Sequence, residues 1–145
     1  MNRIVSFRGL MLDGAQDTIV LHTNNGSVGY RIVKFQMMGD VRYDHGVVMK
    51  IYKTEQTTID AQIDFNDNTL LAAGYAANHE NIIYPFTEQV IFDNEIFNQD
   101  IYITAKDIET GVRCNYYLEL EQMPLDLNES TVATLKDIRN IKRTV

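Results

Sequence analysis

One cysteine and no tryptophan occur among the 145 residues of this chain, and none of its apolar runs is long. The single thiol, Cys114, cannot form an intrachain disulfide, so we expect the protein to fold in a reducing compartment such as the cytoplasm. Since a membrane-spanning helix needs about 20 consecutive apolar residues, the short runs argue against one. Residues 1–8 (MNRIVSFR) have neither the apolar stretch nor the cleavage site of a secretion signal, so none is expected.

Basic residues are also in deficit, because the formal net charge is −7. A general nucleic-acid-binding protein needs clustered lysine and arginine to neutralise phosphates, so this class is disfavoured. The deficit is uneven: residues 130–145 carry four basic residues against one acidic residue, a formal +3, which leaves −10 on the rest of the chain. Such a basic segment could bind its own acidic body, an identical copy or another acidic protein, or it could stay solvated without a partner.

What the chain does have is a recurring two-residue period. Residues 101–106 and 116–121 alternate apolar with polar side chains, as a strand with one face in a core does. Short strands joined by turns predict one domain, an all-β, jelly-roll-like antiparallel β-sandwich of about eight strands over residues 1–129. The further strands are expected at residues 3–7, 18–23, 28–38, 47–54, 57–65 and 88–93.

Two antiparallel hairpins are predicted from the turn residues. Asn25-Gly26 is a strong hairpin signal, so residues 18–23 are expected to pair with residues 28–38. The polar loop 107–111 ends in Gly111, which can supply the positive φ of a tight turn, so residues 101–106 are expected to pair with residues 116–121.

Two segments have helical character. Residues 70–77 (LLAAGYAA) are rich in alanine and leucine, which favour a helical turn over a strand, although Gly74 weakens that preference. Residues 131–143 place apolar side chains on one broad face and predict a C-terminal helix, which Thr134 and Asp137 would cap if it began late. Residues 130–145 are therefore expected to form a basic helix or arm that is separate from the sandwich.

No segment carries a recognisable catalytic or metal-binding motif. Residues 64–68 (DFNDN) copy the first ligands of a calcium-binding EF-hand loop, but Thr69 stands where glycine is needed and Tyr75 where a glutamate belongs. Serine never occurs within a G-x-S-x-G motif, and residues 26–29 lack the lysine and following helix of a phosphate-binding loop. We therefore expect no catalytic residue, no metal ligand and no cofactor. A few isolated side chains could in principle serve in catalysis or metal binding, and we interpret them instead as buried, structural or solvated. They are Cys114, His22, His45, His79, and the pairs Asp93 with Glu95 and Glu119 with Glu121.

The residues expected to act are those that would touch a partner. Tyrosine suits interfaces because it buries area while keeping a polar tip, and eight tyrosines are present. Tyrosine also suits sugar stacking, although the chain lacks tryptophan, the better platform. The C-terminal helix combines an apolar face with basic side chains, so the predicted docking set is Leu135, Lys136, Ile138, Arg139, Ile141, Lys142 and Arg143.

Four segments give the chain a resemblance to a known group of proteins. They are residues 29–36 (GYRIVKFQ), 90–102 (VIFDNEIFNQDIY), 115–122 (NYYLELEQ) and 127–140 (LNESTVATLKDIRN). In these segments the chain resembles small capsid-associated virion proteins of marine tailed bacteriophages. The resemblance contains no active-site motif and carries over no individual functional residue, but it implies a structural role as a capsid cement or decoration protein.

The resemblance sets the expectation of a non-enzymatic virion protein, assembled in the host cytoplasm, that stabilises contacts between capsid subunits. Its expected partners are the major capsid protein, copies of itself, or both, without nucleic acid or membrane. The alternative is a receptor- or glycan-binding module of a phage tail or fibre, in which an open aromatic groove is expected.

Overall fold

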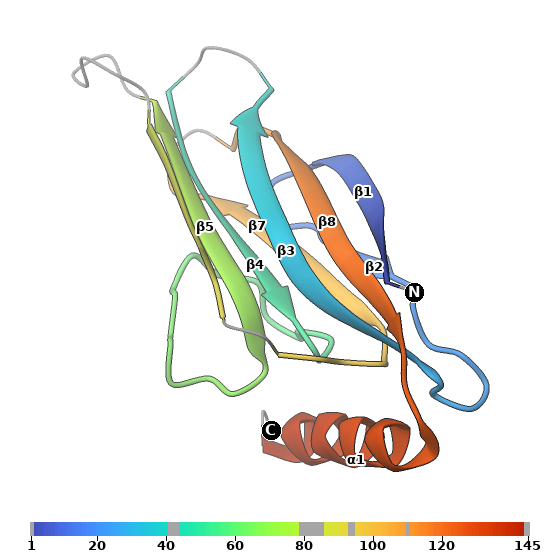
Figure 1. Ribbon diagram of the computed structural model, residues 1–145. Helices are drawn as coiled ribbons and strands as arrows, with labels where there is room; N and C mark the ends of the chain where they lie inside the picture. The colour runs from blue at the N-terminus through green and yellow to red at the C-terminus, as the bar shows by residue number, and fades with distance from the viewer. Residues whose placement is uncertain (1, 41–43, 79–85, 93–94, 110, 144–145) are drawn as a thin grey trace.

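The computed structural model describes residues 2–40, 44–78, 86–92, 95–109 and 111–143, and the side chains only as far as residue 135. Within these residues, two antiparallel sheets pack face to face, with one helix below them (Figure 1). The three-stranded sheet has the order β1 (Arg3–Met11), β8 (Cys114–Pro124), β3 (Val28–Gly39). The five-stranded sheet has the order β2 (Gln16–Ile19), β7 (Ile101–Asp107), β4 (His45–Tyr52), β5 (Leu70–Asn78), β6 (Phe86–Ile91).

The strand order confirms the predicted jelly-roll-like sandwich. The chain passes between the sheets at β1–β2, β2–β3, β3–β4 and β7–β8, so strands that are adjacent in sequence mostly face each other across the core. Strand β6 pairs with β5 and also contacts β3, which joins the two sheets along that side.

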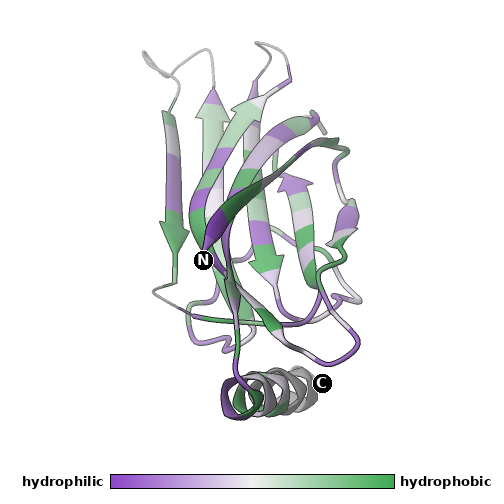
Figure 2. Ribbon diagram, turned by 45° about the vertical axis from the view of Figure 1, so that its right-hand side comes forward, coloured by the Kyte–Doolittle hydropathy of each residue, from purple (hydrophilic) through white to green (hydrophobic). Residues whose placement is uncertain are grey.

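The core lies between the inner faces of the two sheets. Leu118 and Leu120 of β8 and Ile101 and Ile103 of β7 are completely buried, as the alternation of the sequence predicts. Figure 2 shows the corresponding bands of apolar and polar residues along the strands. Strands β7 and β8 therefore follow the inward and outward pattern that the sequence indicates.

Both predicted hairpins are wrong. Strand β7 pairs with β2 and β4, whereas β8 pairs with β1 and β3, so these two strands belong to different sheets. Strands β2 and β3 likewise lie in different sheets, although Gly26 does adopt a positive φ of 65°. The reason is that alternation and turn residues indicate which side chains face the core, but a crossing loop between two sheets can use the same turn chemistry as a hairpin.

Residues 70–77 form strand β5 and not the predicted helical turn. This strand is almost entirely buried because both its faces are covered, so tertiary packing overrides the helical propensity of alanine. Gly74 shows why small residues are needed: a Cβ at this position would lie 2.5 Å from the Met37 sulfur and 3.2 Å from the Phe35 ring. The small side chains of β5 let the three-stranded sheet approach it closely.

The segment that follows β4 is a covering loop, so the strand predicted at residues 57–65 is wrong. Residues 53–69, which we call the strap, lie over part of the outer face of the five-stranded sheet and bury the Lys50 side chain there. Gln56 and Gln16 exchange hydrogen bonds of 2.8 and 3.1 Å between backbone and side chain. The Lys50 ammonium, on the outer face of β4, donates to Asp60 at 2.8 Å and to the Gln62 carbonyl at 2.6 Å.

The charge pair beneath the strap shifts both of its titrating groups. Burial by itself would lower the pKa of the Lys50 ammonium, but hydrogen bonds with Asp60 and Tyr52 outweigh it and raise this pKa. The bond from Lys50 lowers the pKa of the Asp60 carboxyl. The two shifts favour the charged forms, so the pair stabilises the closed strap at neutral pH.

Helix α1 (Leu127–Arg143) confirms the predicted C-terminal helix but begins earlier. Asp126 accepts a 2.8 Å hydrogen bond from the Glu129 backbone, and Glu129 accepts one of 3.3 Å from the Asp126 backbone. This reciprocal capping box replaces the predicted cap at Thr134 and Asp137. Across the described residues, no helix has the length and apolar character needed to cross a membrane.

We predict that Asp60→Ala destabilises the fold by roughly 1–3 kcal/mol, because it removes the charged partner of a buried ammonium. Lys50→Met should cost less, since it leaves only a half-exposed carboxylate behind. Because the folded pKa of Asp60 is depressed, its contribution is present at neutral pH and is lost as the pH falls through that value.

Denaturant unfolding at several pH values measures these differences, with the exposed strap variant Glu55→Ala as the control. A deficit of Asp60→Ala that stays constant into strong acid would contradict the assignment.

Candidate partner interface

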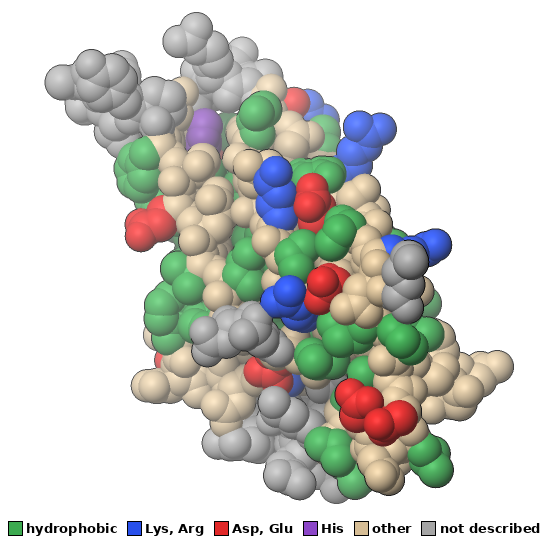
Figure 3. Space-filling model, viewed as in Figure 1, with side chains coloured by type: hydrophobic (Ala, Val, Ile, Leu, Met, Phe, Trp, Pro, Cys, Tyr) green, Lys and Arg blue, Asp and Glu red, His purple; other side chains and the backbone are tan. Residues whose placement is uncertain are grey.

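The outer face of the three-stranded sheet presents exposed side chains, among them Arg8, Gln36 and Met38. Strand register arranges its outward side chains in rows that run across β1, β8 and β3, while their sequence neighbours point into the core. Figure 3 shows basic, acidic and apolar side chains interspersed over this face. The rows are Leu10–Asn115–Met38, Arg8–Tyr117–Gln36 and Ser6–Glu119–Lys34.

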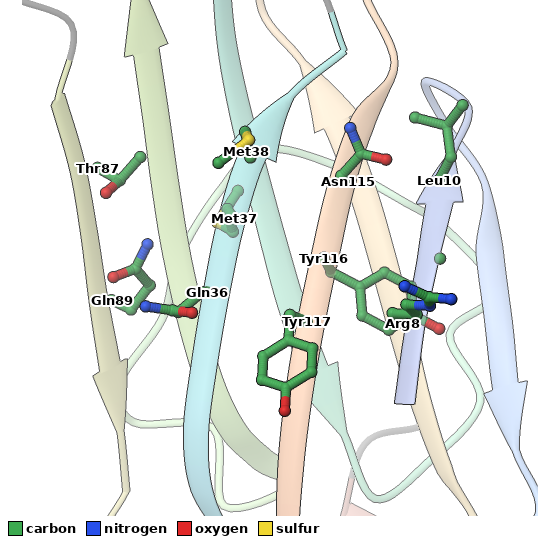
Figure 4. Close-up of a pocket in the computed structure, with 11 residues that line it drawn as sticks. Arg8, Leu10, Gln36, Met37, Met38, Thr87, Gln89, Asn115, Tyr116 and Tyr117 are labelled. Carbon is green, nitrogen blue, oxygen red and sulfur yellow. The ribbon is translucent and has the colours of Figure 1, made fainter. Parts of the chain in front are cut away.

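A groove of about 570 Å³ runs over this face toward β6. Gln36 of β3 and Gln89 of β6 extend toward each other, and the Tyr117 ring projects from β8 (Figure 4). Arg8 and Asn115 add further hydrogen-bonding groups to the lining. The groove is therefore rich in amide, guanidinium and phenol groups, which can bind a polar surface or ligand.

Tyr117 is held in place by charged neighbours. Its hydroxyl donates a 2.7 Å hydrogen bond to Glu119, and the Lys34 ammonium lies 6.0 Å from the centre of its ring. The bond to the Glu119 carboxylate raises the pKa of the Tyr117 hydroxyl. The tyrosine is thus a neutral hydrogen-bond donor at physiological pH and its ring is fixed for contact.

Helix α1 forms the second candidate surface, and a buried asparagine attaches it to the sandwich. The Asn98 side-chain amide is completely buried and donates to the Ser130 carbonyl at 3.3 Å and the Thr134 hydroxyl at 2.8 Å. It also lies 3.2 Å from the Gly26 carbonyl. These bonds connect the helix, the segment before β7 and the β2–β3 crossing, so the first two turns of α1 have a fixed position.

The apolar side chains on the other side of α1 are not used by the core. Val132 is 64% exposed and Leu135 is 54% exposed, while Ala133 is buried against the sandwich. A groove of about 470 Å³ beside the helix is lined by Ile96, Leu125 and Val132, among others. Figure 3 shows apolar side chains at this end of the molecule. The exposed apolar side chains and the groove together offer a surface that a partner could bury.

The predicted docking residues all lie in α1. Leu135 is 54% exposed. The backbone of the others is helical, and their side chains lie outside the described part of the molecule. They are Lys136, Ile138, Arg139, Ile141, Lys142 and Arg143. The sheet groove was not predicted, because β6 and β3 are far apart in sequence and come together only in the folded protein. The sequence indicates only that Gln36 and Tyr117, which alternate with core residues, lie on an outer face.

The isolated candidates for catalysis have structural surroundings. His22 Nδ1 lies 2.7 Å from Asp100, which also accepts bonds from the Leu21 and His22 backbones. Burial alone would raise the pKa of Asp100, but these hydrogen bonds lower it. His45 is buried at the start of β4, and His79 and Asp93 lie outside the described residues.

The acidic candidates are likewise accounted for by local contacts. Glu119 accepts from Tyr117, and Glu121 pairs with Arg31 at 2.7 Å. Asp64 accepts a 2.9 Å bond from the Asn66 backbone, which makes a local turn of the segment that copies an EF-hand. Within the described part of the chain, no three His, Cys, Asp or Glu side chains come together as metal ligands would.

Comparison with protein families and with curated proteins finds no match to this chain.

Cys114 provides a test of the core assignment. Burial raises the pKa of its thiol to about 11 from an ordinary value of 9.0, so about 100-fold less thiolate is present at pH 8. We predict that a thiol reagent modifies folded wild-type protein at least about 100-fold more slowly than Cys114→Ala/Met38→Cys, whose new thiol is on the exposed face. The two should react alike in denaturant. Similar rates in the folded state would contradict the buried position.

Proposed function

We propose that this chain is a non-enzymatic structural protein of a phage particle. In this proposal it is a cement or decoration protein of the virion that binds the major capsid protein, without a cofactor, and stabilises contacts between neighbouring subunits. The resemblance of four sequence segments to small virion proteins of marine tailed bacteriophages motivates the proposal. The jelly-roll architecture is compatible with it, because viral capsid and lectin domains use this fold, although a fold alone does not determine function.

The observation that carries the proposal is the two-sided character of α1. One side is attached to the sandwich by the buried Asn98 amide, and the other presents Val132 and Leu135 to solvent. An amphipathic helix that buried its apolar side in its own core would have these two side chains covered. Their exposure supports a role in contact with another protein.

Charge identifies the kind of surface that fits. The C-terminal residues 130–145 have a formal charge of +3, so an acidic patch on a capsid subunit is the complementary partner. Attraction between these charges would orient the approach, while burial of the apolar side chains would keep the protein bound. Since the Debye length is about 8 Å at 0.15 M salt, higher salt should slow association more than it speeds release.

We predict that Val132→Asp/Leu135→Asp lowers affinity for assembled capsids at least about tenfold, or about 1.4 kcal/mol, without unfolding the sandwich. Ile108→Asp is the matched control. Ile108 is an apolar side chain that is 56% exposed, and it follows the end of β7 that is farther from α1. Co-sedimentation with particles measures occupancy, and circular dichroism checks folding.

Deleting residues 135–145 should have the same effect, because Ser130 and Thr134 retain their bonds to Asn98. Wild-type occupancy by either helix variant would refute the docking role of α1.

A second candidate function is recognition of a receptor or glycan by a tail or fibre module. The sheet groove favours it, since Gln36, Gln89 and the Tyr117 ring offer the mixture of hydrogen bonds and ring contact that sugars use. Capsids and purified host-surface polysaccharide can be compared as ligands for the same protein. Binding to the polysaccharide that Tyr117→Ala abolishes, with no binding to capsids, would favour this alternative.

A further inference from the structure

Strand β1 is an open edge of the three-stranded sheet. It pairs with β8 along all nine of its residues, and no other described strand lies beside it (Figure 1). An open edge of this length has a row of backbone donors and acceptors that another strand can use.

The direction of these backbone groups follows from β3. Tyr30 exchanges both of its backbone hydrogen bonds with Phe97, so its groups point away from β8. Because Tyr30 lies opposite Gln122, the even-numbered residues of β8 must bond to β1, and their partners there are odd-numbered. The outward N–H and C=O groups of β1 therefore belong to Ile4, Ser6, Arg8 and Leu10.

This edge carries two arginines, Arg3 and Arg8, but it lacks other features by which proteins prevent strand pairing. Strand β1 contains no proline and no lysine, and its register with β8 is uninterrupted by a bulge. Two of its side chains on the outer face of the sheet are large, apolar and exposed: Ile4 is 53% exposed and Leu10 is 43% exposed. On the inner side, Val5 and Phe7 are only partly buried against the core. A strand added here would cover apolar surface on both sides of the sheet.

We propose that a second copy of this chain occupies the edge, with the two β1 strands antiparallel and Phe7 on the twofold axis. Ile4 then lies opposite Leu10 of the second copy, and Ser6 lies opposite its Arg8. All four outward-facing residues of each copy are paired, and each opposed pair exchanges two hydrogen bonds. The result is a continuous sheet in the order β3-β8-β1-β1-β8-β3, with an isologous interface.

The sequence of β1 selects this register among the symmetric alternatives. An axis at Ser6 would place Leu10 opposite Asn2, beyond the end of the strand, and would lose an apolar pair. An axis at Arg8 would place the two Arg8 side chains directly opposite each other, which is repulsive. In the proposed register the two arginines are diagonal neighbours, so moderate salt should strengthen the dimer. Capsid docking through α1 should respond to salt in the opposite sense, so the two interactions can be distinguished.

The first experiment uses sedimentation velocity of the full chain over a range of concentrations. Wild type should show a monomer–dimer equilibrium. Ser6→Pro removes an outward N–H without removing a bond to β8, so it should weaken dimerisation at least tenfold. Ser6→Ala keeps the N–H and should behave as wild type. A monomer at all concentrations would overturn the proposal, as would a folded Ser6→Pro variant that dimerises normally.

The second experiment tests the register without proline. Opposed residues in antiparallel strands are close enough for a disulfide, whereas residues several positions apart are not. Under mild oxidation, a mixture of Ile4→Cys and Leu10→Cys proteins should form the mixed disulfide dimer in large excess over either homodimer. The native Cys114 is buried and does not compete. Preferential homodimers of Ser6→Cys or Arg8→Cys, or no cross-link in any mixture, would refute the proposed pairing.

Discussion

Burial of two alternating strands against each other is the constraint on which the rest of this structure depends. The inner side chains of β7 and β8 fill the space between the sheets, and both strands are central in their own sheets. Each must therefore have neighbours on both sides, which draws in β1 and β3 on one face and β2 and β4 on the other. The crossing loops are a consequence of this arrangement. The chain leaves one sheet and enters the other after β1, β2, β3 and β7, whereas β4 to β7 follow one another within the five-stranded sheet.

The lower end of the sandwich depends on one satisfied amide. A buried polar group is costly unless it is hydrogen-bonded, and Asn98 meets this requirement with atoms from a crossing loop and from α1. It thereby fixes the direction in which the helix leaves the sandwich. The exposed apolar side of α1 is thus a consequence of buried polar bonding on its other side. The first two turns of α1 thus bind the sandwich on one side and expose Val132 and Leu135 on the other.

Residue periodicity was sufficient to predict the class of the fold, the inward faces of β7 and β8, and a C-terminal helix. It failed for strand pairing, because alternation indicates which side faces the core and contains nothing about the neighbouring strand. It failed at β5, where the alanines that favour a helix are needed as small side chains beside Met37 and Phe35. It also failed for the groove, since Gln36 and Gln89 are far apart in sequence and meet only where β6 reaches β3. The docking set on α1 stays a prediction. It could be made from the sequence because an apolar helix position followed by basic residues is visible there.

The strap makes the two outer faces of the sandwich different from each other. It covers part of the outer face of one sheet, where Lys50 and Gln16 hold it, while the outer face of the other sheet stays open. Any partner that binds the open sheet must therefore meet the protein in one orientation, with the strap on the far side. Residues 62–66 of the strap are exposed, so a foreign peptide inserted there would point outward from every copy that coats a surface. The same loop that closes one face would then serve as a uniformly oriented display position.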